Sequence, residues 1–144
     1  MTDPVYLEDE RATASLARRV ADAVGAGDVI HLVGPVGVGK TTLVRHLCAA
    51  RGVEEDVTSP TFSIAHLYQG DGIAIGHIDL YRTERLTPSS VGDLEAYLAE
   101  DGLVIIEWPE AGSGLPDPTL VIDLEFGEGD GRVAHLRWLR ERAA

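Results

Sequence analysis

The sequence has few cysteines and no long apolar run. Its single cysteine, Cys48, cannot form an internal disulfide, so we expect a reducing compartment. No apolar stretch approaches the roughly 20 residues that a membrane-spanning helix needs. The residues before Arg11 include several acids and no base, which is the opposite of a secretory or mitochondrial leader. Together these absences predict a cytoplasmic protein with no membrane contact.

Basic residues are also scarce, and the formal net charge is −12. A free-standing nucleic-acid binder normally carries a basic surplus that neutralises phosphates. A role on RNA or DNA would therefore need a partner that supplies the basic surface. The acidity is compatible both with an acidic docking face and with a simple effect on solubility. A chain of 144 residues fits one domain, residues 1–144, around one core.

The only lysine, Lys40, lies in a glycine-rich loop. Residues 34–41 read Gly-Pro-Val-Gly-Val-Gly-Lys-Thr, which matches the phosphate-binding P-loop pattern. The apolar run 29–33 predicts a buried strand before the loop, and the apolar spacing of residues 41–50 predicts a helix after it. Because a P-loop requires this order of strand, loop and helix, a chance glycine turn is the weaker interpretation.

The pattern assigns chemistry to each part of the loop. Successive amide N–H groups and the start of the helix would surround phosphate oxygens. Lys40 would reach the β- and γ-phosphates, and the Thr41 hydroxyl would ligate Mg²⁺. ATP is favoured by elimination, since a Ras-type GTPase reads its base with Asn-Lys-x-Asp and this chain has no second lysine.

Two carboxylates follow predicted buried strands. Asp79 ends the strand around residues 75–78, and Glu107 directly follows residues 103–106. Ligands of open α/β sheets collect at the carboxyl ends of the strands. Either residue could hold Mg²⁺ or orient the attacking water, and the sequence leaves open which one positions the water. The alternative for each is a surface carboxylate at a strand end.

Three neighbours of these carboxylates are weaker candidates. On a strand, His77 shares a face with Asp79, and we expect it to orient Asp79 or to pack in the core. Arg82 could stabilise charge on the γ-phosphate, although such an arginine more often pairs with a local acid. Trp108 could stack or gate near the nucleotide or could belong to the core.

Hydroxyl residues flank Pro60 soon after the predicted helix. Thr58, Ser59 and Thr61 lie where other P-loop proteins place switch loops that sense the γ-phosphate. A plain hydroxyl-capped turn is equally compatible with this segment.

The remaining pattern gives the fold class. We expect strands at 5–7, 62–68, 73–80 and 120–126, turns at 70–72 and 127–131, and helices at 10–24 and 93–100. The tail from Arg132 could be a strand that becomes a helix. These elements predict an α/β fold, a P-loop NTPase-like three-layer sandwich with a mixed, mainly parallel central sheet.

An ordered series of blocks makes the chain similar to a known family over nearly its whole length. They are Asp9-Glu10-x-Ala12-Thr13, the P-loop with Thr41-Thr42, Ser59-Pro60-Thr61-Phe62, His77-Ile78-Asp79-Leu80-Tyr81-Arg82, Glu107-Trp108-Pro109 and Leu115-Pro116-Asp117-Pro118. The chain resembles the TsaE family, bacterial P-loop ATPases needed to make threonylcarbamoyladenosine in tRNA. It departs from the family pattern at residues 86–92, which are shorter and lack an acidic, leucine-rich start.

The resemblance implies a Mg²⁺-dependent ATPase that is weak alone and serves other proteins. TsaE-like proteins work with TsaB and TsaD, and TsaD transfers the threonylcarbamoyl group to tRNA. ATP hydrolysis drives or resets that complex, so tRNA is contacted only indirectly. The implied metal ligands are Thr41 and Glu107, and the implied catalytic residues are Lys40, Asp79 and Glu107. The implied nucleotide contacts are Thr13, Gly37, Val38, Gly39, Lys40, Thr41, Thr42, Ser59, Thr61, Trp108 and Arg132.

Two other functions compete with this interpretation. A small-molecule kinase should show several arginines that clamp donor and acceptor phosphates, and only Arg82 and Arg85 lie between Arg51 and Arg132. Glu107 and Asp79 argue against a non-hydrolysing ATP-binding adaptor.

Overall fold

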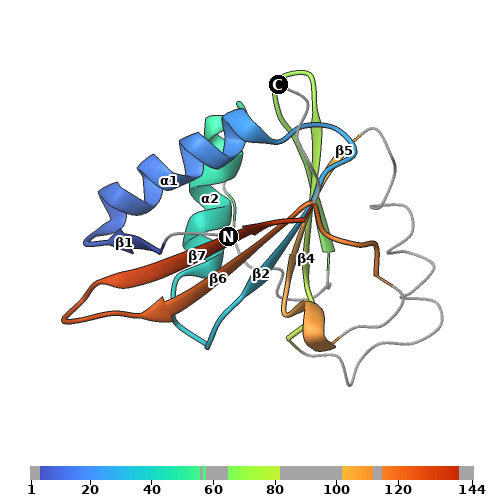
Figure 1. Cartoon of the computed structure of the whole chain (residues 1–144). Coiled ribbons are helices and arrows are strands. Elements are labelled where there is room, and N and C mark those ends of the chain that lie inside the picture. The colour runs from blue at the N-terminus through green and yellow to red at the C-terminus, as the bar shows by residue number, and fades with distance from the viewer. Residues whose placement is uncertain (1–3, 56, 58–64, 82–101, 112–114, 140–144) are drawn as a thin grey trace.

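The computed structural model describes residues 4–55, 57, 65–81, 102–111 and 115–139 (Figure 1). It contains a seven-stranded sheet in the order β1-β7-β6-β2-β5-β4-β3. The strands are β1 (Val5–Leu7), β2 (Val29–Val33), β3 (Ala65–Gln69), β4 (Ala74–Asp79), β5 (Gly102–Glu107), β6 (Leu120–Phe126) and β7 (Arg132–Trp138). The helices are α1 (Glu10–Ala23), α2 (Lys40–Ala50) and a 3-10 turn, η2 (Pro109–Ala111).

The predicted α/β class with a mixed sheet is confirmed. The four neighbouring strands β6, β2, β5 and β4 run parallel to one another. Strands β7 and β3 pair antiparallel with the two ends of this group, and β1 adds antiparallel to β7. β3 and β4 pair antiparallel across residues 70–72, where a turn was expected. The tail from Arg132 is strand β7 as far as Trp138, and residues 140–144 are outside the described part of the chain.

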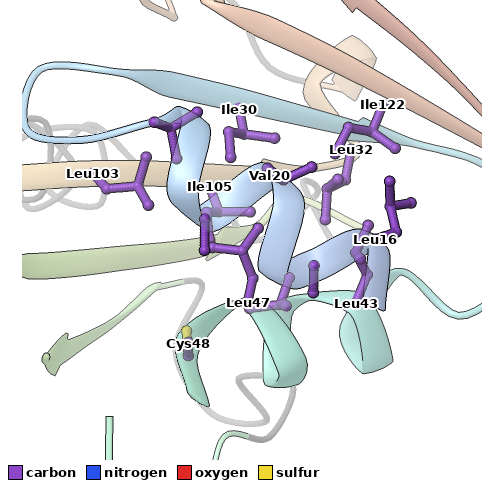
Figure 2. Close-up of a cluster of buried hydrophobic side chains, with 14 of the residues drawn as sticks. Leu16, Val20, Ile30, Leu32, Leu43, Leu47, Cys48, Leu103, Ile105 and Ile122 are labelled. Carbon is purple, nitrogen blue, oxygen red and sulfur yellow. The ribbon is translucent and has the colours of Figure 1, made fainter. Parts of the chain in front are cut away.

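Both described α-helices lie on one side of the sheet (Figure 1). Asp9 caps α1, because its carboxylate accepts the Ala12 amide at 2.9 Å. One apolar cluster lies between the helices and the sheet. It contains Leu16 and Val20 of α1 and Leu43 and Leu47 of α2. Figure 2 shows them with Cys48, Ile30, Leu32, Leu103, Ile105 and Ile122. Burial of this apolar surface is what fixes the helices to the sheet.

The opposite face of the sheet carries a smaller apolar cluster. It consists of Val29, Ala65, Ile78, Leu80, Val104 and Ile106, with Trp108 and Leu115 packed against it. The helix predicted at 93–100 lies outside the described residues, as does the start of the strand predicted at 62–68. No described helix has both the length and the apolar content to span a bilayer.

The alternation of the two faces positions the polar residues at the ends of β4 and β5. Ile75 and Ile105 face the helices. Because side chains on a strand alternate, residues two further along share that face. His77, Asp79 and Glu107 therefore lie on the helix side, with Asp79 directly opposite Glu107 in the parallel register. This register brings two carboxylates to the start of α2.

Candidate functional site

The glycine-rich loop connects the carboxyl end of β2 to the start of α2, as predicted. Gly37 and Gly39 have φ angles of 82° and 110°, a region that L side chains rarely adopt. At Gly34, where φ is +153°, space is a further constraint, since an added Cβ would lie 2.6 Å from the carbonyl oxygen of Leu124. Gly39 is the N-cap of α2 and offers no side-chain cap. The first amides of α2 therefore remain for water or an anion.

Lys40 is buried at the base of this loop, with 5% of its surface exposed. Its ammonium donates to the carbonyl oxygens of Gly34 at 2.6 Å and Pro35 at 2.9 Å. It also lies 4.2 Å from the ring centroid of Trp108. Burial lowers the pKa of Lys40, while the negative charges of Glu107, Asp79 and Glu110 act in the opposite direction.

Thr41 and Glu107 meet across the gap between α2 and β5. The Thr41 hydroxyl lies 3.3 Å from Oε1 and 3.2 Å from Oε2 of Glu107. Because a carboxylate only accepts, the hydroxyl is the donor. Glu107 is the last residue of β5 and is only 2% exposed. A buried carboxylate is unfavourable unless donors or cations surround it.

A second donor reaches Glu107 from β4. His77 is completely buried, and its Nε2 lies 2.5 Å from Oε2 of Glu107. Of the two alternatives given for His77, packing in the core is confirmed, and its Nε2 contacts Glu107 rather than Asp79. The reason is the register, because His77 lies opposite Ile105 and its ring extends along the sheet to Glu107.

Asp79 lies at the open end of β4. It is half-buried, and its Oδ1 accepts the Tyr81 amide at 3.0 Å. This contact bends the chain directly after the strand and leaves Asp79 beside the P-loop cavity.

One cavity of about 310 Å³ joins these residues. Eight of the residues named from the sequence line it, namely Gly37, Gly39, Lys40, Thr41, Thr42, Asp79, Glu107 and Trp108. Sequence reasoning missed two other lining residues, Val36 and Tyr81. The rings of Tyr81 and Trp108 lie 4.9 Å apart and form one wall. The position of Tyr81, two residues after Asp79, was the available signal for it.

Three further predicted residues do not line the cavity. Val38 is buried, and its carbonyl accepts Nε of Arg132 at 3.0 Å, so Arg132 contacts the P-loop backbone. Thr13 lies in α1, where its hydroxyl donates to the Asp9 carbonyl at 3.5 Å, and it does not line the cavity. The predicted residues Thr58, Ser59, Thr61 and Arg82 lie outside the described part of the chain.

The groups around the cavity fit a nucleotide with a hard cation. An ammonium and free helix amides suit phosphate oxygens. The hydroxyl of Thr41 and the carboxylate of Glu107 are the oxygen ligands that Mg²⁺ prefers. In the part of the chain that the structure describes, no cluster of three or more His, Cys, Asp or Glu could hold a metal alone. A Mg²⁺ ion would therefore take further oxygens from phosphate and water, as it commonly does.

Comparison with known proteins gives a consistent picture. Residues 7–134 match the family model described as threonylcarbamoyl adenosine biosynthesis protein TsaE. Proteins named tRNA threonylcarbamoyladenosine biosynthesis protein TsaE include one from Nostoc, 34% identical over 92% of this chain and 83% of its own length. Another, from Streptomyces coelicolor, is 43% identical over 66% of each chain.

A solved structure has the same fold. The crystal structure of Bacillus subtilis YdiB superposes with a TM-score of 0.79 and covers 97% of this chain and 88% of its own. At 24% sequence identity, this similarity extends to the arrangement of helices and strands.

Proposed function

This chain belongs to the TsaE family of tRNA threonylcarbamoyladenosine biosynthesis proteins, and from that premise we propose that it binds and hydrolyses Mg²⁺·ATP in the P-loop cavity. Hydrolysis would drive or reset the TsaB–TsaD complex. The observation that carries the proposal is the convergence of Lys40, Thr41, Asp79 and Glu107 on one cavity. They come from α2, β4 and β5 and meet at the carboxyl ends of parallel strands, where α/β proteins bind ligands.

Each residue has a role that its surroundings support. Lys40, now bonded to two loop carbonyls, would hold the β- and γ-phosphates. Thr41 and Glu107 would hold Mg²⁺, which when bound neutralises charge on phosphate oxygens. Asp79 stands opposite Glu107 at the cavity wall, where it can orient a water molecule. Trp108 and Tyr81 would limit the access of bulk water from their side of the cavity.

The charge of the chain supports a role beside other proteins. With a net charge of −12, it would contact tRNA only through a complex whose other members supply the basic surface. We place this work in the cytoplasm, where the single buried thiol needs no disulfide partner.

One assay tests the proposal. ATP hydrolysis is measured with the purified chain alone and then with TsaB, TsaD and tRNA together. We expect slow turnover alone and a clear increase with the partners. Arg45→Ala changes an exposed residue of α2 and should behave like the wild type. A rate of hydrolysis that is unchanged by the partners but raised by a small metabolite would contradict this proposal and indicate a small-molecule kinase.

A further inference from the structure

His77 has a polar contact that core packing alone does not require. It lies in β4 with none of its surface exposed, and its Nε2 is 2.5 Å from Oε2 of Glu107. From this geometry we infer that His77 is a positioning residue that fixes the Glu107 carboxylate against Thr41. The inference deepens the proposed function and rests on it, since it names the group that holds the Mg²⁺-site carboxylate in place.

A buried imidazole costs folding free energy at a position that needs only core packing. Its Nδ1 is buried and has no hydrogen-bond partner among the described residues. A buried, unpaired polar atom costs free energy that an apolar side chain would not. Ile75 occupies the same face of β4 two residues earlier and is equally buried. The hydrogen bond to Glu107 therefore explains why a histidine, and not an apolar residue, occupies this position.

Glu107 needs such a second anchor. The terminal torsion of a glutamate is soft, so one hydrogen bond does not fix the plane of its carboxylate. Here Thr41 approaches from α2 and His77 from β4, and both contact Oε2. Because a carboxylate only accepts, Nε2 of His77 carries the hydrogen.

The two anchors differ in one respect that matters for a ligand. Thr41 lines the cavity, whereas His77 does not. A cation that engages the Thr41 hydroxyl can therefore change the first contact without displacing the second. His77 would hold Glu107 in one orientation throughout, as outer residues of metal sites commonly do.

The first test compares His77→Leu with His77→Gln in the partner-stimulated ATPase assay. Leu removes the donor, so kcat should fall about 10–100-fold, the usual effect of losing an outer hydrogen bond at a metal site. The dissociation constant of a fluorescent ATP analogue should change less than threefold, which corresponds to about 0.6 kcal/mol of binding free energy. Gln offers an N–H at a similar reach and should recover most of the turnover. His135→Leu removes a surface imidazole that lies 3.0 Å from Glu125 and should have no effect.

The second test separates positioning from general stability. In a Glu107→Ala background, His77→Leu should cause no further loss of turnover, because no carboxylate remains for His77 to hold. Multiplicative losses, or wild-type turnover in His77→Leu, would overturn the inference. If His77→Leu does not fold, His77→Asn replaces it, since its amide is too short to reach Glu107 and only Gln should then restore turnover.

The third test needs no nucleotide. Proton–nitrogen NMR of the histidine side chains in the ligand-free chain should show an Nε2–H resonance of His77 that exchanges slowly with solvent. Glu107→Gln should move this resonance, and Glu125→Gln should leave it in place. If the wild-type chain fails to bind ATP, the proposed function fails, while this measurement still decides the link between His77 and Glu107. A His77 resonance unaffected by Glu107→Gln would refute the link.

Discussion

The hydroxyl of Thr41 lies 3.2 Å from Oε2 of Glu107, which joins the first turn of α2 to the last residue of β5. These residues are distant in the sequence, and the parallel pairing of β2 with β5 brings them together. The contact places an O–H donor against a buried negative charge. A cation could bind at this pair, because both side chains offer oxygen ligands.

Glu107→Gln should leave ATP binding largely intact and slow its turnover. The amide keeps the size of the side chain and an oxygen that can accept from Thr41, but it loses the negative charge and the basic oxygens. We expect a fall in kcat of about 10²–10⁴-fold, the range for loss of a general base or a comparable group. Steady-state hydrolysis and equilibrium binding of an ATP analogue measure the two effects separately.

The matched control for this variant is Glu128→Gln, which removes an exposed carboxylate in the turn after β6. It should hydrolyse ATP at the wild-type rate. Normal turnover in Glu107→Gln would transfer the catalytic role to Asp79.

Lys40→Ala should abolish ATP binding without unfolding the domain. The ammonium contacts two carbonyl oxygens of its own loop and the Trp108 ring, all of them local to the site. Lys40→Arg should not restore binding, because a planar guanidinium does not fit where a compact ammonium donates to two carbonyls at 2.6 and 2.9 Å. Thermal melting checks the fold, and calorimetric titration with Mg²⁺·ATP checks binding. A wild-type affinity in Lys40→Ala would exclude the P-loop as the nucleotide site.

Gly34→Ala should destabilise the protein more than Gly129→Ala. At Gly34 a Cβ would lie 2.6 Å from the Leu124 carbonyl oxygen and 2.9 Å from Cγ1 of Val38. At Gly129, where φ is +60°, nothing lies within 4 Å of an added Cβ. Overpacking of this kind costs about 1–3 kcal/mol, so urea denaturation should separate the variants by that amount. Equal midpoints would mean that β6 and the loop move apart freely.

Local pattern was enough to predict the centre of the site. The strand at 29–33, the glycine loop and the helix after it follow one another along the chain, so their order is fixed by sequence and stereochemistry. Asp79 and Glu107 were predictable as strand-end carboxylates because the buried runs before them are unambiguous. Both line the cavity together with Lys40 and Thr41.

Contacts that depend on register were beyond sequence reasoning. The partner of His77 is decided by the pairing of β4 with β5, which sets His77 opposite Ile105 and within reach of Glu107. A shift of one residue would turn His77 to the other face. The contact of Arg132 with the Val38 carbonyl likewise needs β7 to run beside the loop, whereas the family resemblance implied Arg132 only as a nucleotide contact.

Cys48 should be unreactive toward thiol reagents in the folded protein. It is fully buried, and burial raises the pKa of Cys48 from its ordinary 9.0 to about 12. Because the thiolate is the reactive form and the sulfur is inaccessible, labelling must wait for the chain to open. With a stability of about 5 kcal/mol or more, labelling at pH 8 should be at least about 10³-fold slower than in denaturant. Since the chain has no other cysteine, the signal has one source.

The raised pKa of Cys48 also makes the stability of the fold depend on pH, and the direction of the shift gives the sign of that dependence. The unfolded thiol loses its proton near pH 9, whereas the folded one keeps it up to about 12, so the folded state binds more protons between these values. The contribution to stability is fully present below pH 9 and declines as the pH rises. By pH 10 the loss should be about 1.4 kcal/mol. Comparing urea denaturation of the wild type with that of Cys48→Ala at pH 8 and pH 10 isolates this effect, because every other titrating group is shared. Parallel pH profiles for the two proteins would show that Cys48 ionises as readily in the fold as outside it.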